Sequence, residues 1–195
     1  MSSLLVLVKH AQPVLDPSVP AREWALSQVG ESQARNLADQ LRRYLPFRLI
    51  TSVEQKAYRT GEIISDALGL PVSPADDVQE IDRRALPIVA PRVYEEMNAP
   101  IFSDVDRPVL GRESARDALE RFRVAVNREA ARTVGKNLVI VSHGTVISLL
   151  CAAYGGLDAF TLWKELDCPS FVVLTLPALD VVEAPVALEP NGWQP

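Results

Sequence analysis

Two uninterrupted apolar runs, each leading directly into a histidine, constrain the fold of this chain more than any other feature of its sequence. Residues 4–8 lead into Lys9 and His10, and residues 138–141 lead into Ser142 and His143. Apolar runs of this length without alternation are typical of strands that are covered on both faces, as in the parallel sheet of an α/β domain. These are the two histidines of the chain. We therefore expect both of them at the carboxyl ends of buried strands.

Helix-like and strand-like segments alternate along much of the chain. Apolar residues recur at helical spacing in 27–44, in 55–68 and from Ser114 to just before Gly135, and the apolar stretch after Gly144 predicts a buried helix that reaches Tyr154. Short apolar runs at 47–51, 170–176 and 181–188 predict further strands. This order predicts an α/β fold, namely a three-layer sandwich with a mostly parallel central sheet and helices on both faces.

The stretch 71–111 interrupts this pattern. Proline and acidic residues break every period there, although a short helix is expected at 92–97. We interpret the stretch as an excursion from the sheet that lies over the active site. Since no internal repeat or low-complexity linker divides the chain, residues 1–195 are expected to form a single domain.

Composition and charge exclude several classes of protein. With 195 residues, 48% of them apolar and 23% charged, the chain has enough material for one well-filled core. A net charge of −5 provides no basic surface for nucleic acid, and no apolar run approaches the roughly 18 to 20 residues that cross a membrane. The first residues show no secretion signal, and the two cysteines, Cys151 and Cys168, have neither metal-ligand spacing nor the density of a disulfide scaffold. We therefore expect a cytoplasmic protein whose cysteines are structural.

The positions of the two histidines predict an anion site. In an open parallel sheet the ligand crevice lies beyond the carboxyl ends of the strands, and both His10 and His143 are expected at such ends. The two strands can be neighbours in the sheet, so that the two imidazoles meet. A helix that begins near Gly144 would add its positive N-terminus to the same place.

Five short motifs follow one another along the chain in an order typical of one family. They resemble the motifs of the histidine phosphatase superfamily, also called phosphoglycerate mutase-like, over nearly the whole chain. The motifs are Lys9-His10-Ala11, the segment Thr51 to Thr60, Glu80-Ile81-Asp82-Arg83, Gly111-Arg112-Glu113-Ser114 and Ser142-His143-Gly144. The chain departs from the family twice in the same sense, because Lys9 and Lys56 stand where the family has arginine.

The resemblance implies a role for each residue of the site. His10 is the nucleophile that forms a phosphohistidine, and a hydrogen bond from its other ring nitrogen to the backbone would leave the attacking nitrogen free. Glu80 is the general acid and then the general base, with a pKa raised toward neutral by partial burial, and Asp82 is the reserve candidate. Further groups hold the phosphoryl oxygens, and we expect no metal and no cofactor among them. These groups are His143, Lys9, Lys56, Arg83 and the backbone at Gly144.

The function implied is hydrolysis of a small phosphomonoester, or of a protein phosphohistidine, by a metal-independent phosphatase. Two alternatives stay open: a phosphoglycerate-type mutase, although mutases of the family are usually longer, and a degenerate module that binds a phosphorylated ligand without turning it over. The two lysines favour the module modestly and predict slow turnover or an altered substrate, because lysine lacks the planar fork of arginine. Arg22, Arg59 or Arg84 could compensate. The oligomeric state, monomer or homodimer, is open.

Overall fold

The computed structural model describes residues 3–83 and 88–187 and contains a six-stranded sheet with the strand order β3-β2-β4-β1-β5-β6. Strands β3, β2, β4 and β1 are parallel to one another, whereas β5 and β6 are antiparallel additions at one edge. The expected mostly parallel sheet is therefore confirmed. The strands are β1 (Leu4–Lys9), β2 (Phe47–Ser52), β3 (Val72–Ala75), β4 (Asn137–Ser142), β5 (Ser170–Thr175) and β6 (Val181–Ala187).

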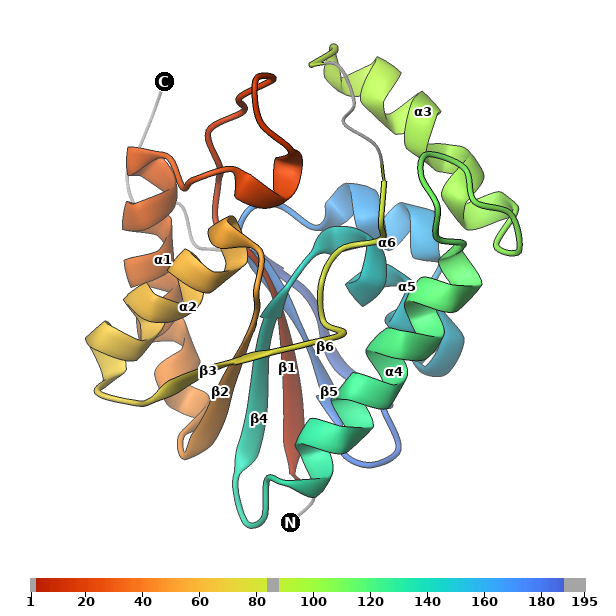
Figure 1. Ribbon diagram of the computed structural model, residues 1–195. Helices are drawn as coiled ribbons and strands as arrows, with labels where there is room; N and C mark the ends of the chain where they lie inside the picture. The colour runs from red at the N-terminus through yellow and green to blue at the C-terminus, as the bar shows by residue number, and fades with distance from the viewer. Residues whose placement is uncertain (1–2, 84–87, 188–195) are drawn as a thin grey trace.

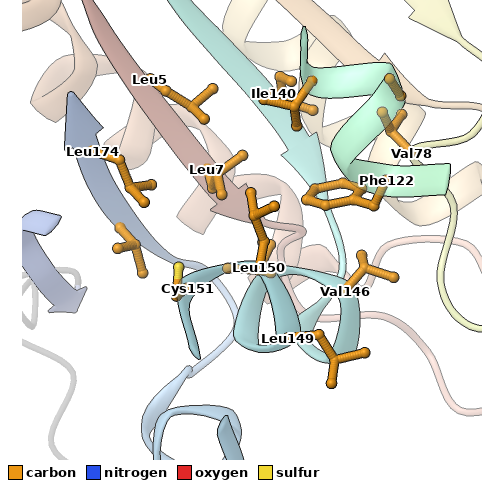
Figure 2. Close-up of a cluster of buried hydrophobic side chains, with 14 of the residues drawn as sticks. Leu5, Leu7, Val78, Phe122, Ile140, Val146, Leu149, Leu150, Cys151 and Leu174 are labelled. Atoms are coloured by element: carbon orange, nitrogen blue, oxygen red, sulfur yellow. The ribbon is translucent and has the colours of Figure 1, made fainter. Parts of the chain in front are cut away.

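Helices cover both faces of the sheet, as Figure 1 shows, with α1 and α2 on one side and α4 and α5 on the other. The side chains of β1 explain this layering, because successive residues of a strand point to opposite faces. Leu5 and Leu7 pack into the core beneath α4 and α5, where Figure 2 shows them near Leu150, while Val6 and Val8 pack into the core beneath α1 and α2. The three-layer α/β sandwich predicted from the apolar runs is confirmed. The helices are α1 (Gln28–Leu41), α2 (Gln55–Leu68), α3 (Pro91–Ser103), α4 (Ala115–Ala131), α5 (Gly144–Gly155) and α6 (Ala159–Glu165), with short 3₁₀ turns η1 (Ala21–Glu23) and η2 (Arg42–Tyr44).

Strands β1 and β4 lie side by side, and their register brings the two histidines together. Lys9 pairs with Ser142 in the ladder, and the backbone N–H of His10 donates to the carbonyl oxygen of Ser142 at 3.1 Å. Each histidine is thus the first residue beyond its strand, at the same edge of the sheet. The expectation of two neighbouring strands that end in histidine is confirmed.

The stretch 71–111 differs from the expected excursion at its start and in its helix. Residues Val72–Ala75 belong to the sheet as edge strand β3, which pairs only with β2, so Pro74 has no second ladder to disrupt. The short helix expected at 92–97 is the longer α3, with Pro91 in its first turn. Helix α6 was not expected, because its seven residues are too few to show a clear helical period. Within residues 3–83 and 88–187, no helix is long and apolar enough to cross a membrane.

Candidate active site

His10 follows β1 directly, and its imidazole is fixed by its own loop. His10 is 7% exposed, and its Nδ1 lies 2.9 Å from the carbonyl oxygen of Ala11. Because a carbonyl oxygen only accepts hydrogen bonds, Nδ1 must donate, and this tautomer leaves the lone pair of Nε2 free. The next backbone N–H, that of Ala11, donates to the Thr60 hydroxyl on α2 at 3.1 Å. The loop that orients the ring is therefore anchored to the neighbouring helix.

His143 lies beside His10 at the beginning of α5. The two ring centroids are 5.2 Å apart, with an interplanar angle of 62°. On one side Nε2 lies 2.9 Å from the Ser52 hydroxyl at the end of β2. On the other side Nδ1 is buried and, among the described residues, has no hydrogen-bond partner. A buried polar atom of this kind is costly to leave unpaired, so Nδ1 is available to a ligand.

Both imidazoles are neutral at physiological pH. Burial lowers the pKa of His10 well below its ordinary value of 6.5, and the neighbouring His143 and Lys56 lower it further. Burial is also the main cause that lowers the pKa of His143 well below 6.5, with Lys56 adding to it. A neutral His10 keeps the lone pair that a nucleophile needs.

Glu80 reaches the same place from the loop that follows β3, and both of its carboxylate oxygens are engaged. Oε2 accepts from Arg83 Nη2 at 2.8 Å and from the backbone N–H of Thr145 in the first turn of α5 at 3.2 Å, while Oε1 accepts from the N–H of Ile81 at 3.0 Å. The side chain is 12% exposed. Asp82, the reserve candidate, is exposed at the surface. Glu80 is thus the member of this pair of acids that faces the histidines.

The pKa of Glu80 differs from the sequence-based expectation. Burial acts to raise it, as expected, but the Arg83 guanidinium, His143 and the N–H of Ile81 favour the ionised form and hold the pKa below its ordinary value. Arg83 is itself half-buried and donates to Tyr94 and Asn98 of α3 as well as to Glu80. In the unliganded protein Glu80 is therefore a carboxylate, which suits a base and requires a proton before it can act as an acid.

Arg121 of α4 holds the loop that carries Glu80, a role that no pattern in the sequence predicted. Its guanidinium donates to the backbone carbonyls of Asp77, Gln79 and Glu80 and is paired with Glu113 at 2.6 Å. Glu113 also accepts from the N–H of Asp82 at 2.8 Å. A single side chain thus fixes three carbonyl groups of the loop.

In the motif Gly111-Arg112-Glu113-Ser114, Gly111 and Ser114 have structural roles. A Cβ at Gly111 would lie 1.9 Å from the carbonyl oxygen of Asp82, so only glycine permits the backbone bridge between Gly111 and Arg83. Ser114 caps α4 by accepting from the N–H of Asp117. The motif is therefore structural, and it positions the loop of Glu80 from outside the site.

The two lysines border the histidines, but their ammonium groups are bound to backbone carbonyls. Lys9 Nζ donates to the carbonyl oxygen of Leu166, and its side chain passes alongside Gly144. Lys56, near the start of α2, is 6% exposed and donates to the carbonyl oxygen of Ala21 at 2.8 Å. Both contribute to the lowered pKa of His10, which reflects their closeness to the ring.

Of the three arginines considered as substitutes, two are paired with acidic side chains. Arg22 is exposed and pairs with Glu23, and Arg59 pairs with Glu31 and Glu62 on the outer side of α2. Arg84 lies outside the described residues. The structure therefore gives no sign that Arg22 or Arg59 replaces the arginines that Lys9 and Lys56 stand for.

Glu54 is a second carboxylate of the site that sequence reasoning missed. It precedes α2 and is bonded through Oε2 to Lys56 Nζ at 2.6 Å, while Oε1 accepts the backbone N–H of Glu80 at 2.9 Å. Oε1 also lies 3.7 Å from His143 Nε2. Its spacing, two residues before Lys56, was the available signal, but a polar turn after a strand usually contains such residues without a role in a site.

A cavity of about 590 Å³ lies next to this cluster and meets it at Lys9, although neither histidine is among the residues that line it. Its wall includes the aromatic rings of Tyr94 and Trp163, and Gln12 and Gln33 contribute amides. Cavities of this size accommodate small molecules. Within residues 3–83 and 88–187, no group of three or more His, Cys, Asp or Glu side chains is arranged to hold a metal ion.

The fold agrees with comparisons to known proteins. A family model described as the histidine phosphatase superfamily (branch 1) matches residues 5–177. No curated protein sequence matches the chain significantly.

Solved structures with the same fold include three microbial proteins. A mycobacterial hydrolase (22% identity) and the mycobacterial glucosyl-3-phosphoglycerate phosphatase (20% identity) each superpose with a TM-score of 0.75, covering 97% of this chain and 100% of theirs. The phosphoserine phosphatase of Entamoeba histolytica, in complex with 3-phosphoglyceric acid, has 15% identity and a TM-score of 0.73, covering 95% of this chain and 97% of its own. At these identities the similarity is one of fold.

Proposed function

Since this chain belongs to the histidine phosphatase superfamily, branch 1, we propose that it hydrolyses a small phosphorylated molecule through a phosphohistidine formed on His10. The observation that carries the proposal is the fixed tautomer of His10, whose Nδ1 donates to the carbonyl oxygen of Ala11 and leaves Nε2 free beside His143. Solved structures of the same fold bear the names of phosphatases for glucosyl-3-phosphoglycerate and phosphoserine, which supports a small phosphorylated substrate.

In the first step the Nε2 lone pair of His10 attacks phosphorus, and the bond from phosphorus to the ester oxygen breaks. The leaving oxygen takes a proton from Glu80. Glu80 must therefore be protonated in the complex, and the negative charge of the neighbouring phosphoryl group favours this, because like charges disfavour the ionised form. Lys9, Lys56, His143 Nδ1 and the N-terminus of α5 hold the phosphoryl oxygens.

In the second step water replaces the histidine. Glu80, now a carboxylate, takes a proton from the water as its oxygen attacks phosphorus, and the bond from phosphorus to His10 Nε2 breaks with its electron pair returning to nitrogen. Inorganic phosphate and free His10 result. The charge on the phosphoryl group is met by cationic side chains and hydrogen-bond donors, so we propose that no metal is required.

The cavity beside Lys9 is the place that we propose for the alcohol part of the substrate. Its volume of about 590 Å³ fits a small molecule, and Lys9, which lines the cavity and directly precedes His10 in the chain, joins it to the site. Both cysteines are free thiols, and burial raises the pKa of Cys151 to about 12, which keeps it unreactive. Free thiols agree with the proposed cytoplasmic location.

A site that binds a phosphorylated ligand without turnover is the second candidate. The observation that favours it is that both lysine ammonium groups are bound to backbone carbonyls in the unliganded protein. A mutase of phosphoglycerate type would use the same phosphohistidine, but it must keep water away from this intermediate.

Turnover of an aryl phosphate, with a chelator present, tests the proposal. The wild type is expected to release phosphate, and His10→Gln, which preserves a polar side chain of similar reach, is expected to lose at least 1,000-fold while still binding vanadate, because no nucleophile remains. Binding of vanadate by the wild type without turnover of any phosphomonoester would favour the binding module. Loss of activity on chelation and its recovery with Mg²⁺ would contradict the metal-independent mechanism.

A further inference from the structure

Glu54 introduces a negative charge where a phosphatase site is expected to collect positive charge. Its side chain is 12% exposed and lies between Lys56, His143 and the backbone of Glu80. This position differs from the usual one for its place in the chain. Glu54 is the N-cap residue of α2, a position where the side chain of Ser, Thr, Asp or Asn commonly accepts a backbone N–H of the helix, and it makes no such capping bond. The carboxylate is directed into the site instead.

The charges around the two histidines show the consequence of Glu54. Lys9, Lys56 and Arg83 are cationic, Glu54 and Glu80 are anionic, and both histidines are neutral because their pKa values are lowered, so the cluster has a net charge of +1. Without Glu54 the net charge would be +2, which matches a phosphate dianion. With Glu54 the cluster balances an anion of charge −1.

We propose that Glu54 is a specificity-determining residue that makes this site favour phosphoryl groups with a single negative charge over those with two. The inference rests on the proposed function, because it takes the bound anion to be the group transferred to His10. Two effects of Glu54 act in the same direction. The carboxylate repels the anion directly, and its bond to Lys56 at 2.6 Å competes with the anion for that ammonium group.

The protonation of Glu80 agrees with this preference. Glu80 is ionised in the unliganded protein, since Arg83 and His143 hold its pKa below the ordinary value, and it needs a proton to protonate the leaving oxygen. A phosphomonoester monoanion carries one proton on its phosphoryl group, whereas the dianion carries none. A singly charged substrate therefore brings the proton that the acid step consumes, and the net proton count is unchanged when Glu80 passes it to the leaving alcohol.

Two tetrahedral oxyanions of nearly equal size but different charge, tungstate (−2) and perrhenate (−1), test the preference on the intact chain. Their dissociation constants are measured by calorimetry at one pH, with displacement by vanadate to establish a shared site. Since a Coulomb energy is proportional to the charge of the ligand, Glu54→Gln should tighten tungstate about 100-fold and perrhenate about tenfold. The test compares the ratio of the two dissociation constants between variants and the wild type, because other differences between the two anions cancel in this comparison.

Matched variants separate a charge effect in the site from other effects. Glu62→Gln removes the same charge from α2, the helix that follows Glu54, but at the outer pair with Arg59, and it should leave both constants within twofold of the wild type. Glu54→Asp keeps the charge and should keep the wild-type ratio. Glu54→Leu removes the charge without adding an amide and should reproduce the ratio of Glu54→Gln, so that the test does not depend on one variant.

Each outcome has a definite meaning. A ratio that Glu54→Gln and Glu54→Leu leave at the wild-type value would overturn the charge preference and leave the proposed phosphatase function intact. Failure of the wild type and of every variant to bind either anion or vanadate would contradict the proposed function and the inference together. A ratio shifted by about tenfold in favour of tungstate in Glu54→Gln and Glu54→Leu, but not in Glu54→Asp or Glu62→Gln, is the result that we expect.

Discussion

The two sides of the site are held in very different ways. On the side of Glu80, which we call the acid side (residues 77–83), both carboxylate oxygens are bonded and the backbone is fixed by the Arg121 guanidinium from α4. On the lysine side, formed by Lys9 and Lys56, each ammonium group is bound to a backbone carbonyl. The acid side is therefore held by a network of many hydrogen bonds, whereas the ammonium groups of the lysine side are held by only a few.

Because of this difference, the rigid acid side and the adaptable lysine side have separate tasks. A group that transfers a proton must be within hydrogen-bond reach of the leaving oxygen, and a preorganised loop provides that position before substrate binds. A lysine has a compact charge on a flexible stem and can exchange a carbonyl partner for a phosphoryl oxygen when a ligand arrives. We therefore expect changes on the acid side to be costly for catalysis and stability, and changes on the lysine side to act mainly on anion affinity.

The largest effect is expected from Glu80→Gln, which keeps the size of the side chain but removes the proton it transfers. The kcat/KM for alkyl phosphates should fall by about 10² to 10⁴, because their leaving oxygens require protonation, while kcat/KM for activated aryl phosphates should fall less than about tenfold. Steady-state kinetics on both substrate types measures this, and kcat/KM is compared because it excludes the later hydrolysis of the phosphohistidine, in which Glu80 acts as a base for both. Asp82→Asn, at the exposed acid two residues away, is the control and should change neither. Equal losses on both substrate types would deny Glu80 the role of an acid.

The next largest effect concerns the support of the acid side. Arg121→Met removes the donors to three loop carbonyls and leaves Glu113 partly buried without its partner, which should lower the free energy of unfolding by about 3 kcal/mol. Arg123→Met, on the same helix but paired only with Glu120 near the surface, should cost less than about 1 kcal/mol. Urea unfolding of the two variants measures the difference. Equal stability of both would show that the loop does not depend on Arg121.

The two histidines between these sides make stability depend on pH. In the unfolded chain they titrate near 6.5, whereas burial keeps their pKa values well below that in the folded protein. Below pH 6.5 the unfolded state therefore binds protons that the folded state does not, and stability falls as the pH falls.

Between pH 7.5 and 5.5 each histidine should lower the free energy of unfolding by about 1.4 kcal/mol. Urea unfolding at the two pH values measures this. The chain has no other histidine, so His143→Gln should halve the dependence. A stability that does not change over this interval would mean that the imidazoles titrate as if exposed.

The smallest effect is expected on the lysine side. Lys9→Ala should weaken vanadate binding about tenfold, since it removes one charge-assisted hydrogen bond, and it should leave the free energy of unfolding nearly unchanged. Lys164→Ala is the control, because Lys164 borders the same cavity but lies over the ring of Phe160 at 5.0 Å. Calorimetric titration compares the two. Equal affinities in both variants and the wild type would place Lys9 outside the anion site.

The fold and the central pair of the site followed from sequence because both depend on local patterns. Apolar runs predict buried strands, and a residue directly after such a run lies at a sheet edge, which is how His10 and His143 were found together. The edge strand β3 and the short helix α6 were missed because four and seven residues carry little periodicity. Contacts that depend on side-chain conformation across loops were also missed. The bond of Glu54 to the backbone N–H of Glu80 and the three carbonyl bonds of Arg121 join segments whose approach no spacing predicts.

Trapping of the phosphoenzyme tests the central claim most directly. The wild type is mixed with a phosphomonoester carrying labelled phosphorus and quenched within milliseconds, and the labelled peptide is identified. The account predicts label on His10, stable in alkali and lost in acid as a phosphoramidate is, and no label in His10→Gln. Label on any other residue, or no label while the wild type continues to release phosphate, would contradict it.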